Sequence, residues 1–169
     1  MGTVKQALIA LGGNLGTVRD TFIQARKQLD KLPDIELLDS SLLYQTSPVG
    51  VAGQPDYLNA VIRVQCCLSA NRLLDILLGL ERRFGRVRPA PRWSARTLDL
   101  DLLDMEGILL DTPKLILPHP RMHERLFVLR PLCDIAPEWI HPRLGLTAQS
   151  LHDALLERGE PPITEGMQW

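Results

Sequence analysis

Hydrophobic and polar residues follow two periods along this chain, and stretches with one period alternate with stretches of the other. An apolar run over 7–11 leads into a glycine-rich turn at 12–16, which predicts a buried strand and then a tight turn. Apolar residues recur every three or four positions from Val18 to Leu32, and Pro33 ends the pattern, so a helix is predicted there. Residues 37–45 are predicted to be extended again.

The same succession returns in the second half of the chain. Residues 57–68 alternate between polar and apolar side chains, which predicts a half-buried strand whose polar face includes Tyr57 and Asn59. Asn71 is suited to cap the helix that follows, and Gly85 is suited to end it.

Residues 97–103 have period two once more, so three leucines lie on one face of the predicted strand and Asp99 and Asp101 lie on the other. A short helix and a last helix capped by Thr147 are predicted further on. We expect the tail, residues 160–169, to be loosely ordered.

The order of these elements is strand, helix, strand, strand, helix, strand, with pieces appended after them. This order predicts an α+β fold in which helices cover one side of an antiparallel sheet, and it matches the ferredoxin-like βαββαβ arrangement with appended C-terminal elements. A length of 169 residues suits a single domain with its own core, so we expect one domain over 1–169.

Overall charge argues against nucleic acid or an anionic membrane as a partner. The chain has 19 Lys and Arg against 20 Asp and Glu, and its net charge is −1, so we expect neither nucleic acid nor a membrane as a partner. The three cysteines lack metal-ligand spacing and suit thiols in a reducing compartment. No apolar stretch approaches the roughly 20 residues that span a bilayer. We therefore expect a cytoplasmic protein.

Positive charge is nevertheless concentrated in one segment. Between Glu81 and Asp99 there are six arginines and no acidic residue, and the arginines are Arg82, Arg83, Arg86, Arg88, Arg92 and Arg96. Arginine in place of lysine at every position favours planar, bidentate recognition of phosphate. Pro89 and Pro91 interrupt helix and strand alike, which predicts a loop that could close over a ligand or could be an ordinary linker.

Asp99 and Asp101 follow these arginines directly. Mg²⁺ takes hard oxygen ligands and is often held by one or two carboxylates together with substrate phosphates. An Asp-x-Asp pair alone is more often a solvated strand face, and arginines beside it could be a surface salt-bridge patch. The combination of the two favours a site where a metal ion and a phosphate chain meet.

Other candidate side chains lie outside the arginine segment. Tyr57 and Asn59 share a strand face and suit a flat heterocycle, which the ring would stack on and the amide would hydrogen-bond. His119, between two prolines, could donate to a phosphate or could be a structural loop residue. The glycine-rich turn at 12–16 has neither the lysine of a phosphate-binding P-loop nor dinucleotide-fingerprint spacing.

Taken together, the motifs resemble the 6-hydroxymethyl-7,8-dihydropterin pyrophosphokinase family over almost the whole chain. The resemblance rests on separated segments of this sequence, namely 11–16, 54–60, 85–88, 92–101 and 118–122. It implies a ferredoxin-like fold and transfer of the β,γ-diphosphate of ATP to the pterin hydroxymethyl oxygen, with release of AMP. It also implies a monomer that acts on small molecules in folate biosynthesis, with two Mg²⁺ ions.

The resemblance also implies a role for individual residues. The implied catalytic residues are Arg86, Arg96, Asp99 and Asp101, and the two aspartates are the implied metal ligands. The implied ATP-binding residues are Glu81, Arg88, Arg92, His119 and Arg125. The implied pterin-binding residues are Thr46, Val49, Tyr57, Asn59, Trp93 and Phe127.

Small departures from the family pattern leave this reading in place. Gly13 stands where many members have serine, and Pro120 stands where some have tyrosine, which removes a ring that could contact the nucleotide. The loop at 51–53 is about one residue shorter than in some members. The alternatives are a non-catalytic module that binds nucleotide or pterin, a sheet that binds single-stranded RNA, and a kinase for another heterocyclic alcohol.

Overall fold

The computed structural model describes residues 3–48, 53–89, 91 and 94–169. Its elements in chain order are β1 (Lys5–Gly13), α1 (Val18–Asp30), β2 (Ile35–Ser40), β3 (Leu43–Thr46), β4 (Tyr57–Cys66), α2 (Ala70–Arg83), β5 (Asp99–Met105), β6 (Leu110–Asp111), β7 (Ile116–Leu117), the 3-10 helix η1 (Met122–Glu124), α3 (Leu126–Ile135), α4 (Ala148–Glu157) and β8 (Gly166–Met167). Among these helices none is both long and apolar enough to cross a bilayer.

A mixed-length antiparallel sheet forms the centre of the molecule. Its strands lie in the order β5-β1-β4-β3-β8, and β2 pairs with the other end of β4. β1 is central because it pairs with both β4 and β5. β4 lies between β1 and β2, which α1 connects, so this is the split βαβ arrangement and the predicted fold is confirmed. β6 and β7 form a separate hairpin.

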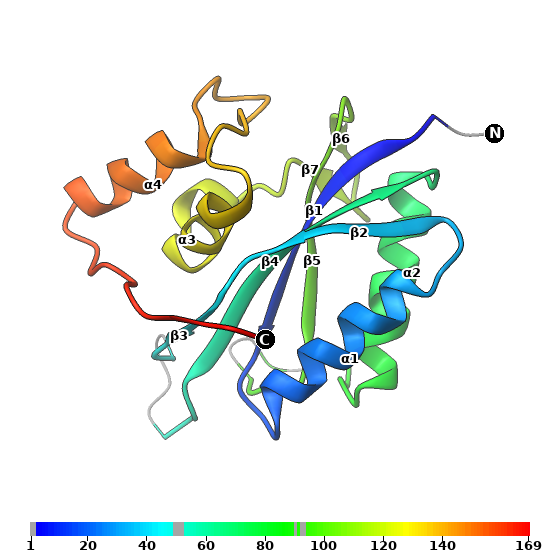
Figure 1. Ribbon diagram of the computed structural model, residues 1–169, viewed down its shortest axis with the longest axis horizontal. Helices are drawn as coiled ribbons and strands as arrows, with labels where there is room; N and C mark the ends of the chain where they lie inside the picture. The colour runs from blue at the N-terminus through cyan, green and yellow to red at the C-terminus, as the bar shows by residue number, and fades with distance from the viewer. Residues whose placement is uncertain (1–2, 49–52, 90, 92–93) are drawn as a thin grey trace.

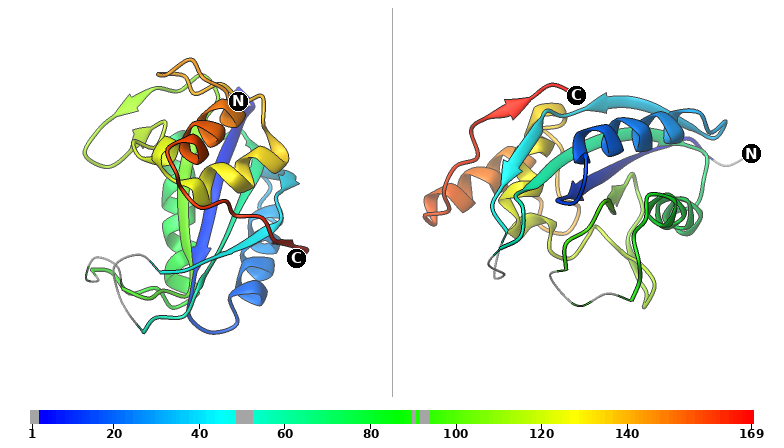
Figure 2. Two further views of the ribbon diagram at one scale, coloured as in Figure 1. Left: turned by 90° about the vertical axis from the view of Figure 1, so that its left-hand side faces the viewer. Right: turned by 90° about the horizontal axis from the view of Figure 1, so that it is seen from below.

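Helices cover both faces of the sheet. Figures 1 and 2 show α1 and α2 on one face and α3 with α4 on the other. Phe22 of α1 and Leu77 of α2 are fully buried in the first core, whereas Val61 of β4 and Leu129 of α3 are fully buried in the second. The expectation of helices on one side only was therefore wrong. The face of β4 predicted to be polar carries Val61, an apolar residue that α3 can cover.

Several local predictions also change. The extended segment predicted over 37–45 is two strands, β2 and β3, with a break at Ser41. The hydroxyl of Ser41 accepts a hydrogen bond from the Val61 N–H at 2.9 Å, which holds the break against β4. Ser69, not Asn71, caps α2, since its hydroxyl accepts from the Arg72 N–H at 3.3 Å.

The helix ends follow the sequence more closely. Gly85 has a φ of 85° directly after α2, a left-handed conformation that glycine adopts without strain. Thr147 caps α4 as predicted, because its hydroxyl accepts from the Ser150 N–H at 3.1 Å. The tail differs from the loosely ordered segment expected from the sequence, since β8 pairs with β3 and Trp169 packs against Phe22.

The glycine-rich turn joins β1 to the segment that precedes β5. The N–H groups of Asn14 and Leu15 donate to the Arg96 carbonyl at 2.9 and 3.1 Å, and the Arg96 N–H donates to the Asn14 side chain at 2.9 Å. A Cβ on Gly13 would lie 2.7 Å from the Thr97 carbonyl oxygen, whereas a Cβ on Gly12 would meet nothing closer than 3.8 Å. Gly13 therefore permits the two chain segments to touch.

We expect Gly13→Ala to lower the free energy of unfolding by about 1–3 kcal/mol, because the new methyl group would push the Thr97 backbone away. Gly12→Ala is the matched control, with an expected change below about 1 kcal/mol. Urea unfolding of the two variants measures the difference. Equal stabilities would show that the contact between Gly13 and Thr97 is not tight in solution.

Candidate active site

Candidate residues from β4 and β5 lie in one row across the sheet. Gly12 of β1 pairs on one side with Asp99 of β5 and on the other with Asn59 of β4. Directly paired residues project from the same face, so Asp99 and Asn59 flank a position that has no side chain. Asp101 lies in the next row, opposite Ala10. The period-two prediction that both carboxylates share a face is confirmed, and Gly12 leaves room between them and Asn59.

Two arginines hold the Asp99 carboxylate. Arg86 donates to one of its oxygens, and Arg96 donates to the other at 2.6 Å. Burial would raise the pKa of Asp99, but the two guanidiniums outweigh burial and hold that pKa below its ordinary value. Asp99 is therefore ionised and paired with cations in this arrangement.

Glu81 lies behind these arginines. Its side chain is only 1% exposed, and it accepts hydrogen bonds from Arg86 at 2.8 Å, Arg88 at 3.0 Å and the Leu100 N–H at 2.8 Å. Burial raises the pKa of Glu81, and the Leu100 N–H and the guanidiniums oppose this effect. The protein groups that surround Glu81 thus connect α2, β5 and the first arginines after α2.

Asp101 lacks such partners. Among the described residues, no hydrogen bond or ion pair reaches its carboxylate. Burial, followed by the charge of Asp99, raises the pKa of Asp101 to about 7, and Arg125 opposes the shift. Ionisation of Asp101 is costly because it is buried and lies next to a second carboxylate. A cation bound between the two would compensate both charges, so this pair is suited to bind one.

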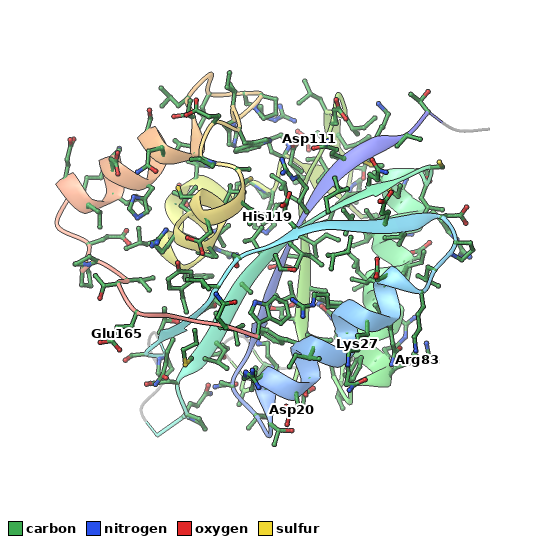
Figure 3. All side chains as sticks on the ribbon, in the orientation of Figure 1. Asp20, Lys27, Arg83, Asp111, His119 and Glu165 are labelled. Carbon is green, nitrogen blue, oxygen red and sulfur yellow. The ribbon has the colours of Figure 1, made fainter. Side chains whose placement is uncertain are left out.

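In the view of Figure 3, the His119 label falls between α3 and the strands of the sheet. Its backbone N–H donates to the Leu103 carbonyl at 2.7 Å, and its Nδ1 accepts from the Arg121 N–H at 3.1 Å. Burial and then the Arg125 charge lower the pKa of His119 to about 4. The imidazole is therefore neutral near pH 7, and its proton lies on Nε2, where it can be donated.

β3 orients the Asn59 amide. The Asn59 nitrogen donates to the Thr46 hydroxyl at 2.8 Å and to the Tyr44 carbonyl at 3.3 Å. Both amide hydrogens are then used within the protein, so the Asn59 oxygen is the group left for a ligand, and it can only accept. A ligand bound there has to donate an N–H or O–H.

Two aromatic rings lie beside arginines that were predicted to belong to the site. The guanidinium carbon of Arg96 is 5.9 Å from the Tyr57 ring centroid, and that of Arg125 is 5.7 Å from the Phe127 ring centroid. Phe127 is 36% exposed and Tyr57 is partly exposed. The structure therefore brings rings, cations and carboxylates to one face of the sheet. Val49, Arg92 and Trp93, which were also predicted, lie outside the described residues.

Cavities alone do not locate this site. A cavity of about 400 Å³ is lined by Glu81, Arg86 and Arg88 together with Leu78, Arg82 and Val87. A larger cavity of about 780 Å³ lies next to Asp104 and Trp139, and none of the predicted site residues that the structure describes lines it. Within the described residues there is also no group of three or more Cys, His, Asp or Glu side chains that could hold a metal ion. A metal ion on the two aspartates would therefore need oxygen atoms from a substrate or from water.

Sequence reasoning missed Asn14 and Gly12. Asn14 is 3% exposed, and its amide nitrogen donates to the Gln54 side chain at 3.2 Å and to the Pro55 carbonyl at 3.1 Å. Through these contacts and its hydrogen bonds to Arg96, Asn14 connects the segment before β4 with the segment before β5. The motif at 11–16 was the available signal, but it predicts only a turn.

Comparison with known proteins is consistent with this geometry. Residues 8–137 match the family model described as 7,8-dihydro-6-hydroxymethylpterin-pyrophosphokinase. A 2-amino-4-hydroxy-6-hydroxymethyldihydropteridine pyrophosphokinase from Synechocystis sp. is 38% identical, over 96% of this chain and 82% of that protein. The protein of the same name from Pseudomonas aeruginosa is 42% identical, over 80% of this chain and 83% of that protein.

Solved structures show the same fold. A Plasmodium falciparum HPPK-DHPS structure with pteroate superposes with a TM-score of 0.74 at 14% identity, over 94% of this chain. This chain spans 43% of that longer protein. At this identity the likeness concerns the fold alone.

We expect Asp101→Asn to stabilise the metal-free and nucleotide-free protein more at high pH than at low pH. The folded-state pKa of Asp101 is raised from 3.8 to about 7, so the wild-type free energy of unfolding falls as pH rises through this range. Asparagine has no proton to lose. Thermal unfolding at about pH 5 and about pH 8 measures the effect. An equal gain for Asp101→Asn at both pH values would contradict the raised pKa of Asp101.

Proposed function

Because this chain belongs to the 7,8-dihydro-6-hydroxymethylpterin-pyrophosphokinase family, we propose that it transfers the β,γ-diphosphate of ATP to the hydroxymethyl oxygen of 6-hydroxymethyl-7,8-dihydropterin. The products are the pterin diphosphate and AMP, and the reaction belongs to folate biosynthesis. The observation that carries the proposal is the meeting of Asp99, Asp101 and the guanidiniums of Arg86 and Arg96 on one sheet face, next to Asn59. A binding module without chemistry would not need this pair of carboxylates.

The proposed metal is Mg²⁺, as two ions, and Asp99 and Asp101 are the residues that would hold it. The donor set supports it, since both groups are hard oxygen ligands and Asp101 has no cation paired with it among the described residues. When bound, Mg²⁺ would neutralise phosphate charge and lower the pKa of the attacking hydroxyl. Each Asp99 oxygen accepts one arginine hydrogen bond, so each keeps a lone pair that a metal ion could use.

We propose that the guanidiniums of Arg86 and Arg96 bind the phosphates. A guanidinium pairs equally well with a carboxylate or with a phosphate, because both accept two parallel N–H groups. Glu81 keeps the chain at Arg86 and Arg88 in place through its own hydrogen bonds, so its part in ATP binding is to position these two side chains. The arginines thereby supply cations where negative charge develops during transfer.

His119 and Arg125 complete the proposed phosphate site. At neutral pH His119 offers its Nε2–H to a phosphate oxygen without adding charge, because its pKa lies near 4. Arg125 adds a cation close enough to Asp101 to influence its pKa. One neutral donor and one cation from the segment before α3 therefore face the carboxylates of β5.

For the pterin we propose stacking on Tyr57 and Phe127 and a hydrogen bond to the Asn59 oxygen. A pterin has an amino group and ring N–H groups, which match an acceptor held in a fixed orientation. Thr46 is close to the same edge because its hydroxyl accepts from Asn59. Val49, Arg92 and Trp93 keep their proposed roles on the basis of sequence resemblance alone.

We further propose that the protein acts as a monomer in the cytoplasm, with small molecules as its partners. The three cysteines are free, which suits a reducing compartment. The net charge of −1 supports the absence of a nucleic-acid partner.

Incubation with ATP, Mg²⁺ and 6-hydroxymethyl-7,8-dihydropterin should yield AMP and the pterin diphosphate in equal amounts. AMP distinguishes diphosphate transfer from an ordinary kinase reaction, which releases ADP. Chromatography of the nucleotides measures the product. Formation of ADP, or no turnover, would contradict the proposed reaction.

Asp99→Ala and Asp101→Ala provide the internal test of the metal ligands. Each should lower the rate of AMP formation about a hundredfold or more, and each should weaken Mn²⁺ binding in the presence of a non-hydrolysable ATP analogue. Asp111→Ala is the matched control with normal activity. Unchanged Mn²⁺ binding by both variants would contradict the metal assignment.

Arg96→Ala should slow the chemical step by about 10²–10³ while weakening pterin binding far less, since its guanidinium lies on Asp99. Single-turnover kinetics and pterin titration separate the two effects. Arg83→Ala, which removes an exposed arginine from the end of α2, is the control (Figure 3). A normal single-turnover rate would show that Arg96 does not act on the reacting phosphates.

A further inference from the structure

The last four residues of the described chain return to the sheet. Figure 1 and Figure 2 show the tail running from α4 to the edge of the sheet beside β3 and then to α1. β8 pairs with β3 through Leu43 with Met167 and Tyr44 with Gly166. A Cβ on Gly166 would lie 2.6 Å from a methyl carbon of Leu42 and 3.2 Å from the Tyr44 ring. Glycine at this position allows the tail to approach β3.

Trp169 attaches the tail to the segment just before β3. Its indole N–H donates to the Ser41 carbonyl at 2.6 Å, at the break between β2 and β3. The guanidinium of Arg26 lies 4.1 Å from the Trp169 ring centroid, and the buried Phe22 ring meets it edge-on at 6.0 Å. An indole held by a hydrogen bond, a cation and an aromatic ring is a strong local attachment.

Two arginines of α1 hold the tail backbone as well. Arg19 donates to the Gln168 carbonyl and Arg26 donates to the Trp169 carbonyl, each at 3.3 Å. The tail is thus attached to α1 and to the start of β3 rather than to α4, which precedes it in the chain.

β3 transmits this attachment to the predicted pterin residues. It lies between β8 and β4, where Tyr44 pairs with Asn59 and Thr46 pairs with Tyr57. The Asn59 amide donates to both Tyr44 and Thr46, so the position of β3 decides where the Asn59 oxygen points. β3 has only four residues. A strand this short depends on its neighbours for its position.

The opposite support of β3 comes from α3. The Tyr44 hydroxyl donates to Asp134, with oxygen distances of 2.8 and 2.9 Å, and the Arg130 guanidinium lies 4.9 Å from the Tyr44 ring centroid. Burial and the Asp134 hydrogen bond raise the pKa of Tyr44 to about 12, so its hydroxyl stays protonated as a donor. The position of β3 is therefore fixed by α3, which binds its Tyr44 side chain, and by β8, which pairs with its outer edge.

We propose that Gly166–Trp169 is a positioning segment for the pterin half of the active site. By holding β3 against β4, it orients the Asn59 acceptor and the Tyr57 ring toward the heterocycle. The phosphate half is attached differently, since Glu81 and Asn14 fasten it to α2 and β1. This inference rests on the proposed function for the identity of the heterocycle. It predicts that the tail affects one substrate and not the other.

The test compares the full chain with a chain shortened to end at Ile163 and with Trp169→Ala. Both variants should raise KM for the pterin about tenfold and leave KM for ATP within about twofold, because the proposed substrate-binding residues that pair with β3, Asn59 and Tyr57, are those for the pterin. Hydrogen exchange should become faster at the amides of β3 and remain unchanged in β5. Equal increases in both KM values, or a lower Tm with neither KM changed, would overturn the proposal.

Conservative variants separate positioning from folding. Trp169→Phe keeps a ring against Arg26 and Phe22 but lacks the indole N–H, so its pterin KM should lie between those of the wild type and Trp169→Ala. Ile140→Ala, at a 58% exposed residue, is the control with unchanged kinetics. If the shortened chain does not fold, Trp169→Phe and Trp169→Ala still decide the question, and identical pterin KM values for both and the wild type would overturn it.

Failure of the underlying function would look different. If the full-length protein released no AMP, the proposed reaction would fail whatever the tail did. Exchange at β3 and binding of the pterin itself, measured by titration, would still report whether the tail positions this pocket. Slower or unchanged exchange at β3 after removal of the tail would overturn the positioning role on its own.

Discussion

The buried carboxylate of Glu81 is the interaction on which the rest of the site depends. A carboxylate at 1% exposure is costly unless donors compensate it, and here the donors come from β5, Arg86 and Arg88. The need to compensate this charge therefore places the C-terminal end of α2, the start of β5 and two arginines next to one another. Arg86 then reaches Asp99 as well as Glu81, so a guanidinium lies between the two carboxylates. Asp101 lies one row further along the same strand face.

The sequence predicted the parts of the site that depend on local periodicity. Period two over 97–103 was sufficient to place Asp99 and Asp101 on one face, and β4 was located in the same way. Burial of Glu81 was not predictable, because it depends on how the segment after α2 folds back: Arg86 and Arg88 turn toward Glu81, and β5 brings the Leu100 N–H to it. The pairing of β8 with β3 was missed for a related reason, since a two-residue strand has no period to detect. The packing of α3 on the second face of the sheet was not predicted, because a single apolar residue of β4, Val61, marks the buried part of a face that is otherwise polar.

In the proposed arrangement, the residues for the two substrates lie on one face of the sheet, on either side of Gly12. The phosphate side is assembled from charged groups whose positions compensate one another, so removal of any one changes the preferred state of the others. The pterin side uses an amide whose hydrogens are both bound by β3, together with exposed rings. Gly12 lies between the two sides and contributes only space. A fold that puts β1 at the centre of the sheet is what allows both sides to meet at a single glycine.

The tail also has a consequence for the behaviour of the protein in concentrated solution. Without β8, the outer edge of β3 would present unpaired N–H and C=O groups, and such an edge is a template for pairing with a strand of another molecule. β8 occupies this edge but is only two residues long, and Trp169 turns the chain toward α1 directly after it. A short strand that ends at an anchored tryptophan offers little length for a further strand to pair with. We therefore expect β8 and Trp169 to lower the tendency of the β3 edge to pair with a strand of another molecule.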